Sequence, residues 1–160
     1  MSKLIDVKIF WQAIGMRAIG AAVVTAADAR GPAGFLALSA THLTADPPTM
    51  MVSIDKRTSA LATVIEAHHF AVNYLPRGSE NVAATFGGSG TLKGADRFEA
   101  GQWTTLATGA PIFADAVGAL DCEVEEVIER HGVAIVIGRL VDFVSNAERE
   151  PLISFRGGYR

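Results

Sequence analysis

Short apolar and β-branched runs, separated by turn-forming residues, recur along most of the chain. Runs of this kind bounded by Gly, Pro, Asp or Asn are typical of β-strands. They predict strands at residues 21–27, 33–42, 49–54, 69–75, 117–129 and 133–144. Helical patterns predict short helices at residues 8–18, 58–66 and 79–86. Strands therefore dominate the predicted structure.

The connections between the predicted strands define the fold class. Most are too short to hold the crossover helix that a parallel strand pair requires. The simplest solution is mainly β: an antiparallel barrel with a few peripheral helices, formed by residues 1–160 as one domain. The apolar run at residues 134–138 predicts a strand buried on both faces, as at a dimer interface. Residues 91–113 are expected to form an irregular surface excursion after a flexible joint at residues 87–90.

Two of the predicted helices carry further signals. In the first, apolar residues recur at helical spacing from Phe10 to Ile14, with Arg17 one turn further on, which indicates an amphipathic helix. The second helix is expected to begin with Thr58 or Ser59 as its N-cap, because hydroxyl side chains favour that position.

Composition and charge narrow the classes of function. The chain has 160 residues, of which 49% are hydrophobic and 19% charged, and its net charge is −3. Nucleic-acid-binding domains usually concentrate basic residues on one face, so we expect no nucleic-acid partner. The only cysteine, Cys122, cannot form an internal disulfide, and flanking Leu120 and Val124 indicate a buried thiol. Because there is no leader pattern and no apolar run of spanning length, we expect a cytoplasmic protein that does not contact membranes.

The segment Gly34–Pro48 is the best candidate for ligand binding. It begins as an apolar strand, continues through Ser39, Thr41 and Thr44, and ends at Asp46-Pro47-Pro48. Its hydroxyls and free backbone N–H groups are the donors from which phosphate oxygens and flavin carbonyls accept hydrogen bonds. The segment therefore predicts contact with a flat, phosphorylated ligand.

A second candidate is the segment Asp55–Ser59, at the start of a predicted helix. Lys56 and Arg57 beside a helix N-terminus would make a suitable phosphate site, because the helix dipole and free N–H groups add to the two positive charges. The same residues also fit an ordinary helix start with solvated charges, so both interpretations remain open.

Other common chemistries lack their sequence signals. No HxH, HxxxH or CxxC spacing occurs, and the adjacent His68 and His69 would point to opposite faces of a strand, so no metal site is expected. Ser39 lacks a G-x-S-x-G context, which argues against a serine hydrolase. The glycines at residues 87–90 follow a helix and not a strand, so any nicotinamide nucleotide would bind without a Rossmann unit.

An ordered series of landmarks runs from Phe10 to Arg160. They are Gly20, VVT (23–25), Gly34, Ser39, DPP (46–48), FAVN (70–73), DRF (96–98), Trp103, Ala110-Pro111, Leu120-Asp121-Cys122, IVIG (135–138) and the final PL…RGGYR. In this order and spacing the chain resembles the flavin reductase family of split-barrel FMN-binding proteins. These proteins are the reductase components of two-component flavin monooxygenases.

The resemblance implies a homodimer of split barrels that binds FMN or FAD near the subunit interface. The residues it places along the flavin ring and ribityl chain are Leu38, Ser39, Ala40, Thr41 and His42. Those it places at the phosphate are Asp55, Lys56, Thr58 and Ser59. The implied reaction is hydride transfer from NADH or NADPH to the flavin, and the reduced flavin would pass to a partner monooxygenase.

The chain departs from the family pattern at two points. Many members carry Ser-Ser-Phe in the flavin segment, whereas this chain has Leu38, Ser39 and Ala40, which leaves more space beside the ring. Members commonly place a histidine near the nicotinamide, and Val133 occupies that position here. If the strand extends back to residue 131, His131 and Val133 share a face about 6.6 Å apart, and His131 is then the candidate catalytic residue; the alternative is that the nicotinamide binds differently here.

Three other functions remain open from the sequence. A flavoprotein whose reduced FMN acts on a bound non-flavin acceptor, such as a corrin metal centre, is consistent with the small Ala40. An FMN-binding electron-transfer module without nicotinamide activity is consistent with Val133. A pyridoxamine-phosphate oxidase of similar barrel type has the least support, because the chain is short and shows no matching substrate-binding pattern.

Overall fold

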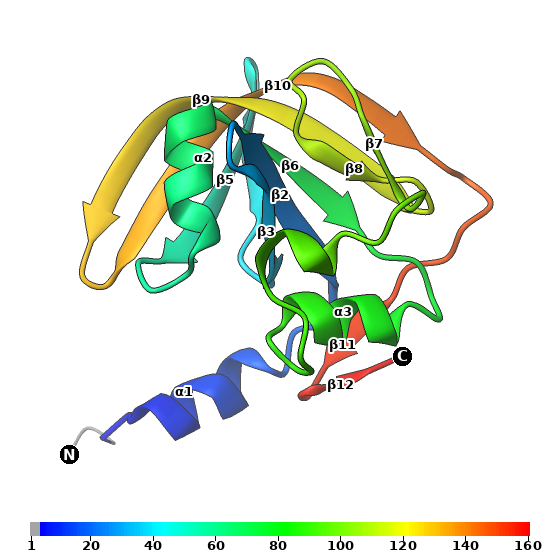
Figure 1. The fold of residues 1–160 in the computed structure, drawn as a ribbon. Coiled ribbons are helices and arrows are strands. Elements are labelled where there is room, and N and C mark those ends of the chain that lie inside the picture. Colours follow the sequence, from blue (N-terminus) through cyan, green and yellow to red (C-terminus); the bar gives the residue numbers. More distant parts are fainter. Residues whose placement is uncertain (1–3) are drawn as a thin grey trace.

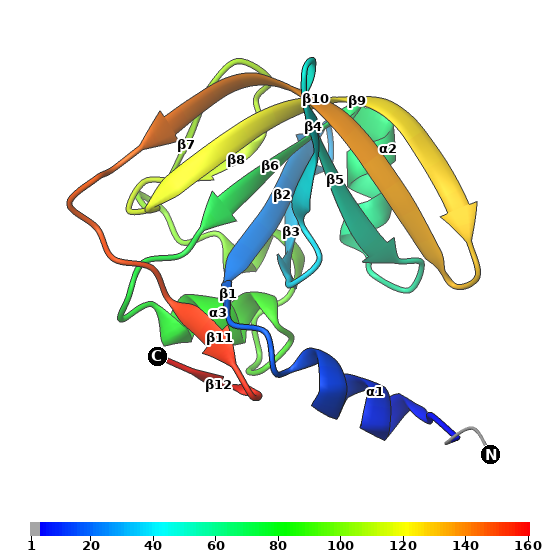
Figure 2. The same ribbon diagram turned by 180° about the vertical axis from the view of Figure 1, so that it is seen from behind.

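One curved antiparallel sheet forms most of the molecule (Figures 1 and 2). The computed structural model describes residues 4–160. The strands of the sheet are β2 (Ala22–Asp28), β3 (Gly31–Ala37), β4 (Thr41–Ala45), β5 (Pro48–Asp55), β6 (His69–Tyr74), β9 (Gly118–Arg130) and β10 (Val133–Ser145). Their order across the sheet is β3-β2-β6-β9-β10-β5-β4, and every neighbouring pair is antiparallel.

The two outermost strands of this sheet are directly connected in the chain. β3 and β4 lie at opposite ends of the strand order, yet only residues 38–40 separate them. A link of this length spans at most about 14 Å when fully extended, so the sheet has to curl until its two edges approach each other. The result is a barrel with an opening between β3 and β4. The prediction of a mainly β, antiparallel barrel is thus confirmed.

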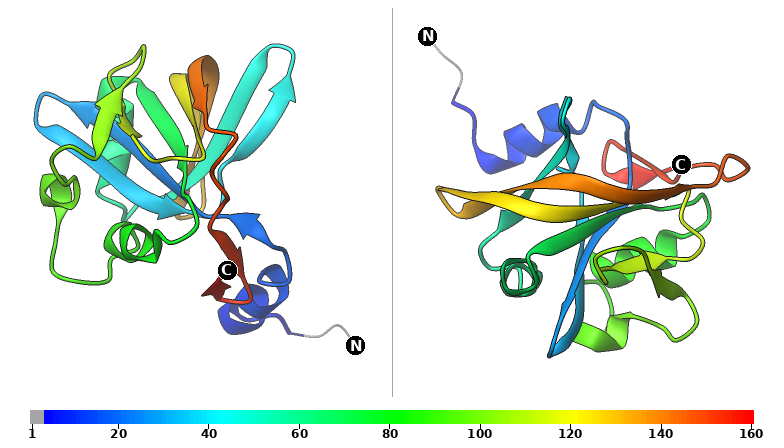
Figure 3. Two further views of the ribbon diagram at one scale, coloured as in Figure 1. Left: turned by 90° about the vertical axis from the view of Figure 1, so that its right-hand side faces the viewer. Right: turned by 90° about the horizontal axis from the view of Figure 1, so that it is seen from above.

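Helices and two small sheets surround the barrel. The helices are α1 (Val7–Ile14), α2 (Ala60–Ala67), α3 (Glu80–Phe86) and the 3₁₀ helix η1 (Gly94–Arg97). One small sheet contains β1 (Ile19–Gly20), β11 (Ile153–Phe155) and β12 (Gly158–Tyr159), and the other pairs β7 (Trp103–Thr105) with β8 (Pro111–Phe113). Figure 3 shows the long β9–β10 hairpin crossing the whole molecule, with α1 and α2 on opposite sides of it. No helix within residues 4–160 is long and apolar enough to cross a membrane.

Two buried clusters fill the space on the two faces of β2. Val23 belongs to the cluster that contains Phe86 and Ile112. The next residue, Val24, belongs to the cluster that contains Ile54 and Phe70. Because successive strand residues point to opposite faces, a strand that is apolar at both positions can sit between two cores. This position explains why the run at residues 21–27 is apolar on both faces of the strand, with Thr25 as its one polar side chain.

The first helix and the strand of the candidate ligand segment both end earlier than predicted. α1 ends at Ile14, with Gly15 as its C-cap, so Arg17 lies beyond the helix. The predicted strand at residues 33–42 is divided into β3 and β4, because the chain leaves the β3 ladder at Leu38 to cross the opening. The segment that was expected to bind a ligand therefore lies outside regular secondary structure at its centre.

The second helix, α2, begins at Ala60, and Ser59 occupies the N-cap position as predicted. Its hydroxyl, however, makes no capping hydrogen bond. The turn before the helix is held by Asp55 instead. The Asp55 carboxylate accepts a hydrogen bond of 2.8 Å from the backbone N–H of Arg57, and its carbonyl accepts one of 2.8 Å from Thr58. The predicted N-cap position is therefore correct, but the capping hydrogen bond expected from a hydroxyl is not formed.

Residues 91–113 were expected to form an irregular surface excursion, and most of residues 91–109 are indeed exposed, but residues 110–113 are buried. β8, at the end of this segment, is buried along its whole length. Trp103 packs at ring-centroid distances of 5.5, 4.8 and 5.1 Å against Phe86, Phe98 and Phe113, respectively. Periodicity does not reveal this aromatic cluster, since its four rings share no regular spacing and the backbone between them is irregular.

Two burial predictions have different outcomes. Cys122 is fully buried as expected, and burial raises the pKa of its thiol to about 12. The run at residues 134–138 is buried on one face only, because Ile135 and Ile137 remain partly exposed. Burial on both faces is therefore not achieved within a single chain.

Candidate functional site

Two cavities meet at the opening between β3 and β4. Their volumes are about 460 Å³ and 720 Å³. The residues that line both cavities are Arg17, Ile19, Ala37, Leu38 and Ser39. The link that closes the barrel therefore also forms a wall shared by the two cavities.

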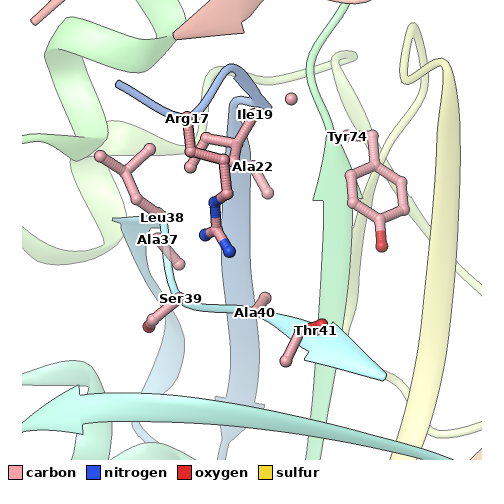
Figure 4. Close-up of a pocket in the computed structure, with 10 residues that line it drawn as sticks. Arg17, Ile19, Ala22, Ala37, Leu38, Ser39, Ala40, Thr41 and Tyr74 are labelled. Atoms are coloured by element: carbon pink, nitrogen blue, oxygen red, sulfur yellow. The ribbon is translucent and has the colours of Figure 1, made fainter. Parts of the chain in front are cut away.

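The smaller cavity combines a small apolar surface with polar side chains. Figure 4 shows the Arg17 side chain extending from the segment before β1 into the space between Ser39 and Tyr74. Thr41, at the start of β4, adds a hydroxyl, and Ala22 on β2 leaves room between the strands. Burial raises the pKa of Tyr74, so its phenol stays protonated at neutral pH and can donate a hydrogen bond.

The larger cavity has aromatic walls that come from distant parts of the chain. Phe10 and Trp11 belong to α1, Phe35 to β3 and Phe155 to β11. Polar side chains also line it: Arg17, Ser39, Ser53, Asp55, Thr58, Ser154 and Arg156. Apolar, partly aromatic walls with a few polar groups are typical of sites for flat organic ligands.

Ser39 is tied to the neighbouring strand. Its hydroxyl donates a hydrogen bond of 3.0 Å to the carbonyl of Ser53 on β5. This bond joins the link at residues 38–40 to β5 and fixes the orientation of the Ser39 side chain. The hydroxyl oxygen can still accept a hydrogen bond from a ligand, because its proton alone is used here.

The two cations of the segment after β5 are paired with carboxylates of the same chain. The Asp55 carboxylate accepts hydrogen bonds of 3.0 and 2.8 Å from the Nε and Nη2 atoms of Arg57, and this pairing lowers the pKa of Asp55 to about 2. The Lys56 Nζ atom lies 3.6 Å from a carboxylate oxygen of Glu129. Both cations that were predicted to attract a phosphate here therefore have carboxylate partners within the chain.

The structure brings together six of the predicted site residues and separates the other four. Those that line the cavities are Leu38, Ser39, Ala40, Thr41, Asp55 and Thr58. Those that line neither cavity are His42, Lys56, Ser59 and His131. The described part of the chain also holds no group of three His, Cys, Asp or Glu side chains arranged for a metal ion.

The expected relation between His131 and Val133 is not formed. β10 begins at Val133, and His131 adopts a left-handed backbone conformation (φ 52°) in the turn before it. The two residues therefore do not share a strand face. Val133 lines the larger cavity while His131 does not. A catalytic role for His131 remains a prediction.

Sequence reasoning did not identify the wall formed by α1, the segment after it and the C-terminal strands. This wall contains Phe10, Trp11, Arg17, Phe155 and Arg156. It is assembled by the pairing of β1 with β11, where Ile19 lies opposite Ser154. This pairing brings the segment after α1 against a strand near the C-terminus, and no local pattern predicts a contact between such distant parts of the chain.

Comparison with known proteins shows that the chain belongs to the flavin reductase family, because residues 16–160 match the family described as flavin reductase like domain. It is 35% identical over 147 residues to the FMN reductase (NADH) RutF of Agrobacterium fabrum, covering 91% of this chain and 83% of that protein. It is also 35% identical over 159 residues to a "Probable flavin reductase" of Rhizobium meliloti. That match covers 99% of this chain but only 50% of the relative, so the chain spans half the length of that protein.

Solved structures of related proteins share the fold. A structure from Haemophilus somnus 129pt superposes with a TM-score of 0.91 at 28% identity, covering 98% of this chain and 99% of the other. The Streptomyces globisporus NADH:FAD oxidoreductase SgcE6, in complex with NAD and FAD fragments, gives 0.87 at 26% identity over 99% and 96%. The styrene monooxygenase flavin reductase of Pseudomonas putida S12 gives 0.81 at 26% identity over 94% and 95%. The barrel is thus the split barrel of flavin reductases.

Proposed function

We propose that the protein is an NADH-dependent flavin reductase that binds FMN, or FAD, in the two joined cavities at the opening of the barrel. The observation that carries the proposal is the meeting of an aromatic and a polar cavity at residues 38–40 in a chain of the flavin reductase family. Related proteins carry the names FMN reductase (NADH) and NADH:FAD oxidoreductase, which supports both the flavin and the nicotinamide nucleotide.

The residues around the cavities fit a flavin. The larger cavity of about 720 Å³ lies within the range of roughly 300–1,000 Å³ that small-molecule sites occupy. Its aromatic walls suit a flat conjugated ring, and the hydroxyls of Ser39, Thr41 and Tyr74 suit the polar edge and side chain of the same ligand.

A bound flavin would supply the acceptor for a hydride from NADH. The chain would supply position and electrostatics. Residues 39 and 40 lie outside the strands, so their backbone N–H groups are available to face the negative charge that develops on a reduced ring. The small Ala40 leaves one side of the link unobstructed, and the α1 side chains Phe10 and Trp11 add aromatic surface to the wall of the larger cavity.

An anaerobic titration tests this proposal. The purified protein would be mixed with FMN or FAD and then with NADH or NADPH, and the flavin absorbance near 450 nm would be followed. We expect bleaching with NADH and FMN. Protein that neither binds FMN nor accelerates the oxidation of NADH would overturn the proposal. The four combinations also reveal which nicotinamide nucleotide and which flavin are preferred.

One observation favours a second candidate, an FMN-binding electron-transfer module without nicotinamide activity. Val133 lines the larger cavity with a side chain that cannot hydrogen-bond to a carboxamide, and His131 lies outside both cavities. Rapid mixing of the FMN complex with NADH separates the two candidates. Binding of FMN without any bleaching by NADH would support the module.

We also infer that the active form is a homodimer. α1 carries no buried residue, although its apolar side chains Phe10 and Trp11 are 49% and 59% exposed. Ile135 and Ile137 on β10 are likewise only partly covered. A second copy of the chain would bury these side chains and complete the walls of the site. Light scattering after gel filtration would reveal the expected doubled mass, and a monomer at micromolar concentration would contradict the inference.

The reduced flavin is proposed to serve a partner monooxygenase in the cytoplasm. A related structure is named a styrene monooxygenase flavin reductase, which supports this role, and the buried thiol of Cys122 suits a reducing compartment. Release of reduced flavin is the discriminating property. A reductase of this type should lose its flavin on dilution, whereas a flavoprotein that acts on a bound non-flavin acceptor should retain it.

A further inference from the structure

Two arginines without carboxylate partners lie on the cavity walls. Arg17 lines both cavities and Arg156 lines the larger one. Among residues 4–160, seven ion pairs occur, and neither Arg17 nor Arg156 takes part in any of them. Asp55, the one carboxylate that lines either cavity, is already paired with Arg57. The unpaired charge facing the cavities is therefore positive, in a chain whose net charge is −3.

The backbone holds these two arginines at the same end of one small sheet. β1 and β11 run antiparallel with Ile19 opposite Ser154. Arg17 precedes Ile19 by two residues and Arg156 follows Ser154 by two, so the side chains leave the strand pair at one end. The backbone N–H of Arg156 also donates a hydrogen bond of 2.9 Å to the carbonyl of Gly15. Two cations placed in this way repel each other, and a bound anion would remove the repulsion.

The local geometry of Arg156 supports a binding role. It adopts a left-handed conformation (φ 52°) in the two-residue turn between β11 and β12, where Asn, Asp or Gly is usually found. Its guanidinium carbon lies 4.8 Å from the centre of the Phe155 ring, which lines the same cavity. Stacking on a ring leaves the N–H edge of the guanidinium free to hold two oxygens of a phosphate.

We propose that Arg17 and Arg156, here called the arginine pair, bind the phosphate or pyrophosphate of a nucleotide that occupies the joined cavities. The inference rests on the proposed function and adds a location to it. It places the phosphate on the wall formed by the pairing of β1 with β11, and not at the segment Asp55–Ser59, where Lys56 and Arg57 each have a carboxylate partner. The charged group would lie on the wall of the larger cavity, which both arginines line, on the side where Arg17 also reaches the smaller cavity.

Fluorescence titrations with FMN and with riboflavin, which lacks the phosphate, test the arginine pair. We expect Arg17→Ala and Arg156→Ala each to weaken FMN binding tenfold or more and to change riboflavin binding less than twofold. Arg17→Lys should give an intermediate loss, because it keeps the charge but not the forked geometry. The matched control is Arg130→Ala, which removes one exposed, unpaired arginine that lines neither cavity. The control should bind both ligands like the wild type.

A second experiment shows whether the bound phosphate belongs to the flavin or to the nicotinamide nucleotide. If the variants bind FMN normally, the KM for NADH is compared with that for dihydronicotinamide riboside, which has no phosphate. A tenfold rise confined to NADH supports the arginine pair as the site for the nicotinamide nucleotide. Unchanged values for both FMN and NADH in both variants overturn the inference and leave the proposed function intact. The inference is also overturned if Lys56→Ala weakens FMN binding selectively while the arginine variants do not. A wild-type protein that binds neither FMN nor riboflavin overturns the proposed function and this inference together.

Discussion

The ring of Phe70 on β6 lies directly over Gly138 on β10, with no space for a side chain at the glycine. A Cβ atom built on Gly138 would lie 2.5 Å from the Cε1 atom of Phe70 and 3.0 Å from the carbonyl oxygen of Glu123. Phe70 is fully buried in the core between the sheet strands. The glycine therefore provides the space that the largest side chain of this cluster requires.

Gly138→Ala should destabilise the protein. The added methyl group has to displace a buried ring or the β9 backbone, and overpacking of this kind costs about 1–3 kcal/mol. Urea unfolding followed by circular dichroism measures the change. The matched control is Gly132→Ala, where a Cβ meets no atom within 4 Å and the backbone conformation is not left-handed. Equal stabilities of the two variants would contradict the close contact with Phe70.

Ser39→Ala should weaken flavin binding by about 1 kcal/mol, roughly fivefold in Kd, because one hydrogen bond that orients the shared cavity wall is lost. The lost bond is the one from the hydroxyl to the carbonyl of Ser53, at 3.0 Å. Thr44→Ala is the control, since Thr44 is an exposed hydroxyl residue on β4 that lines neither cavity. Titration of intrinsic or flavin fluorescence gives both affinities, and an unchanged Kd for Ser39→Ala would exclude it from the site.

Arg57→Ala should raise the pKa of Asp55 from about 2 towards the usual value near 3.9. The side-chain hydrogen bond to Arg57 is the largest cause of the lowered pKa. Because the pKa is lowered in the folded state, the stabilisation from this pair is present above about pH 4 and is lost as the pH falls towards 2. Carboxyl ¹³C chemical shifts during an acid titration report the pKa directly. Arg77→Ala, which removes a different ion-paired arginine, should leave the Asp55 titration unchanged.

Cys122 should be unreactive in the native protein. Burial raises the pKa of the thiol to about 12, so almost no thiolate exists at pH 8, and the sulfur has no exposed surface. We expect no reaction with Ellman's reagent at pH 8 until denaturant is added, when one thiol per chain appears. Rapid reaction without denaturant would show that the core around β9 opens readily.

Local patterns were enough to predict the parts of the fold that depend on local chemistry. The apolar run of β6 and the long hairpin of β9 and β10 appear within a few residues of their predicted bounds. The helix α1 was predicted too long, because Gly15 ends it before Arg17. The aromatic packing of Trp103 was missed, since it joins rings from α3, from β8 and from the residue just after η1, which have no common period.

Only one wall of the candidate site was predicted from the sequence. Ser39 and Thr41 were found because hydroxyl residues beside an apolar strand form a local signal. Arg17 and Arg156 were not connected with each other, because they approach only after β1 pairs with β11 at opposite ends of the chain. Lys56 and Arg57 were expected to face a ligand. In the structure Lys56 pairs with Glu129, and Arg57 pairs with Asp55. Charge near a helix start is a weaker signal for an anion site when nearby carboxylates can pair with it.

The position of residues 38–40 gives the barrel a weak point that a ligand can strengthen. All five residues of β4 are exposed, and this strand pairs with β5 alone, so within the seven-stranded sheet it has the least burial to protect it from local unfolding. A molecule bound at the opening would contact the link that leads into β4. It would thereby hold the free edges of β3 and β4 together. Occupancy should therefore slow hydrogen exchange in β4 more than in β6, which is paired on both sides. The rigidity of this edge would then depend on the concentration of the ligand.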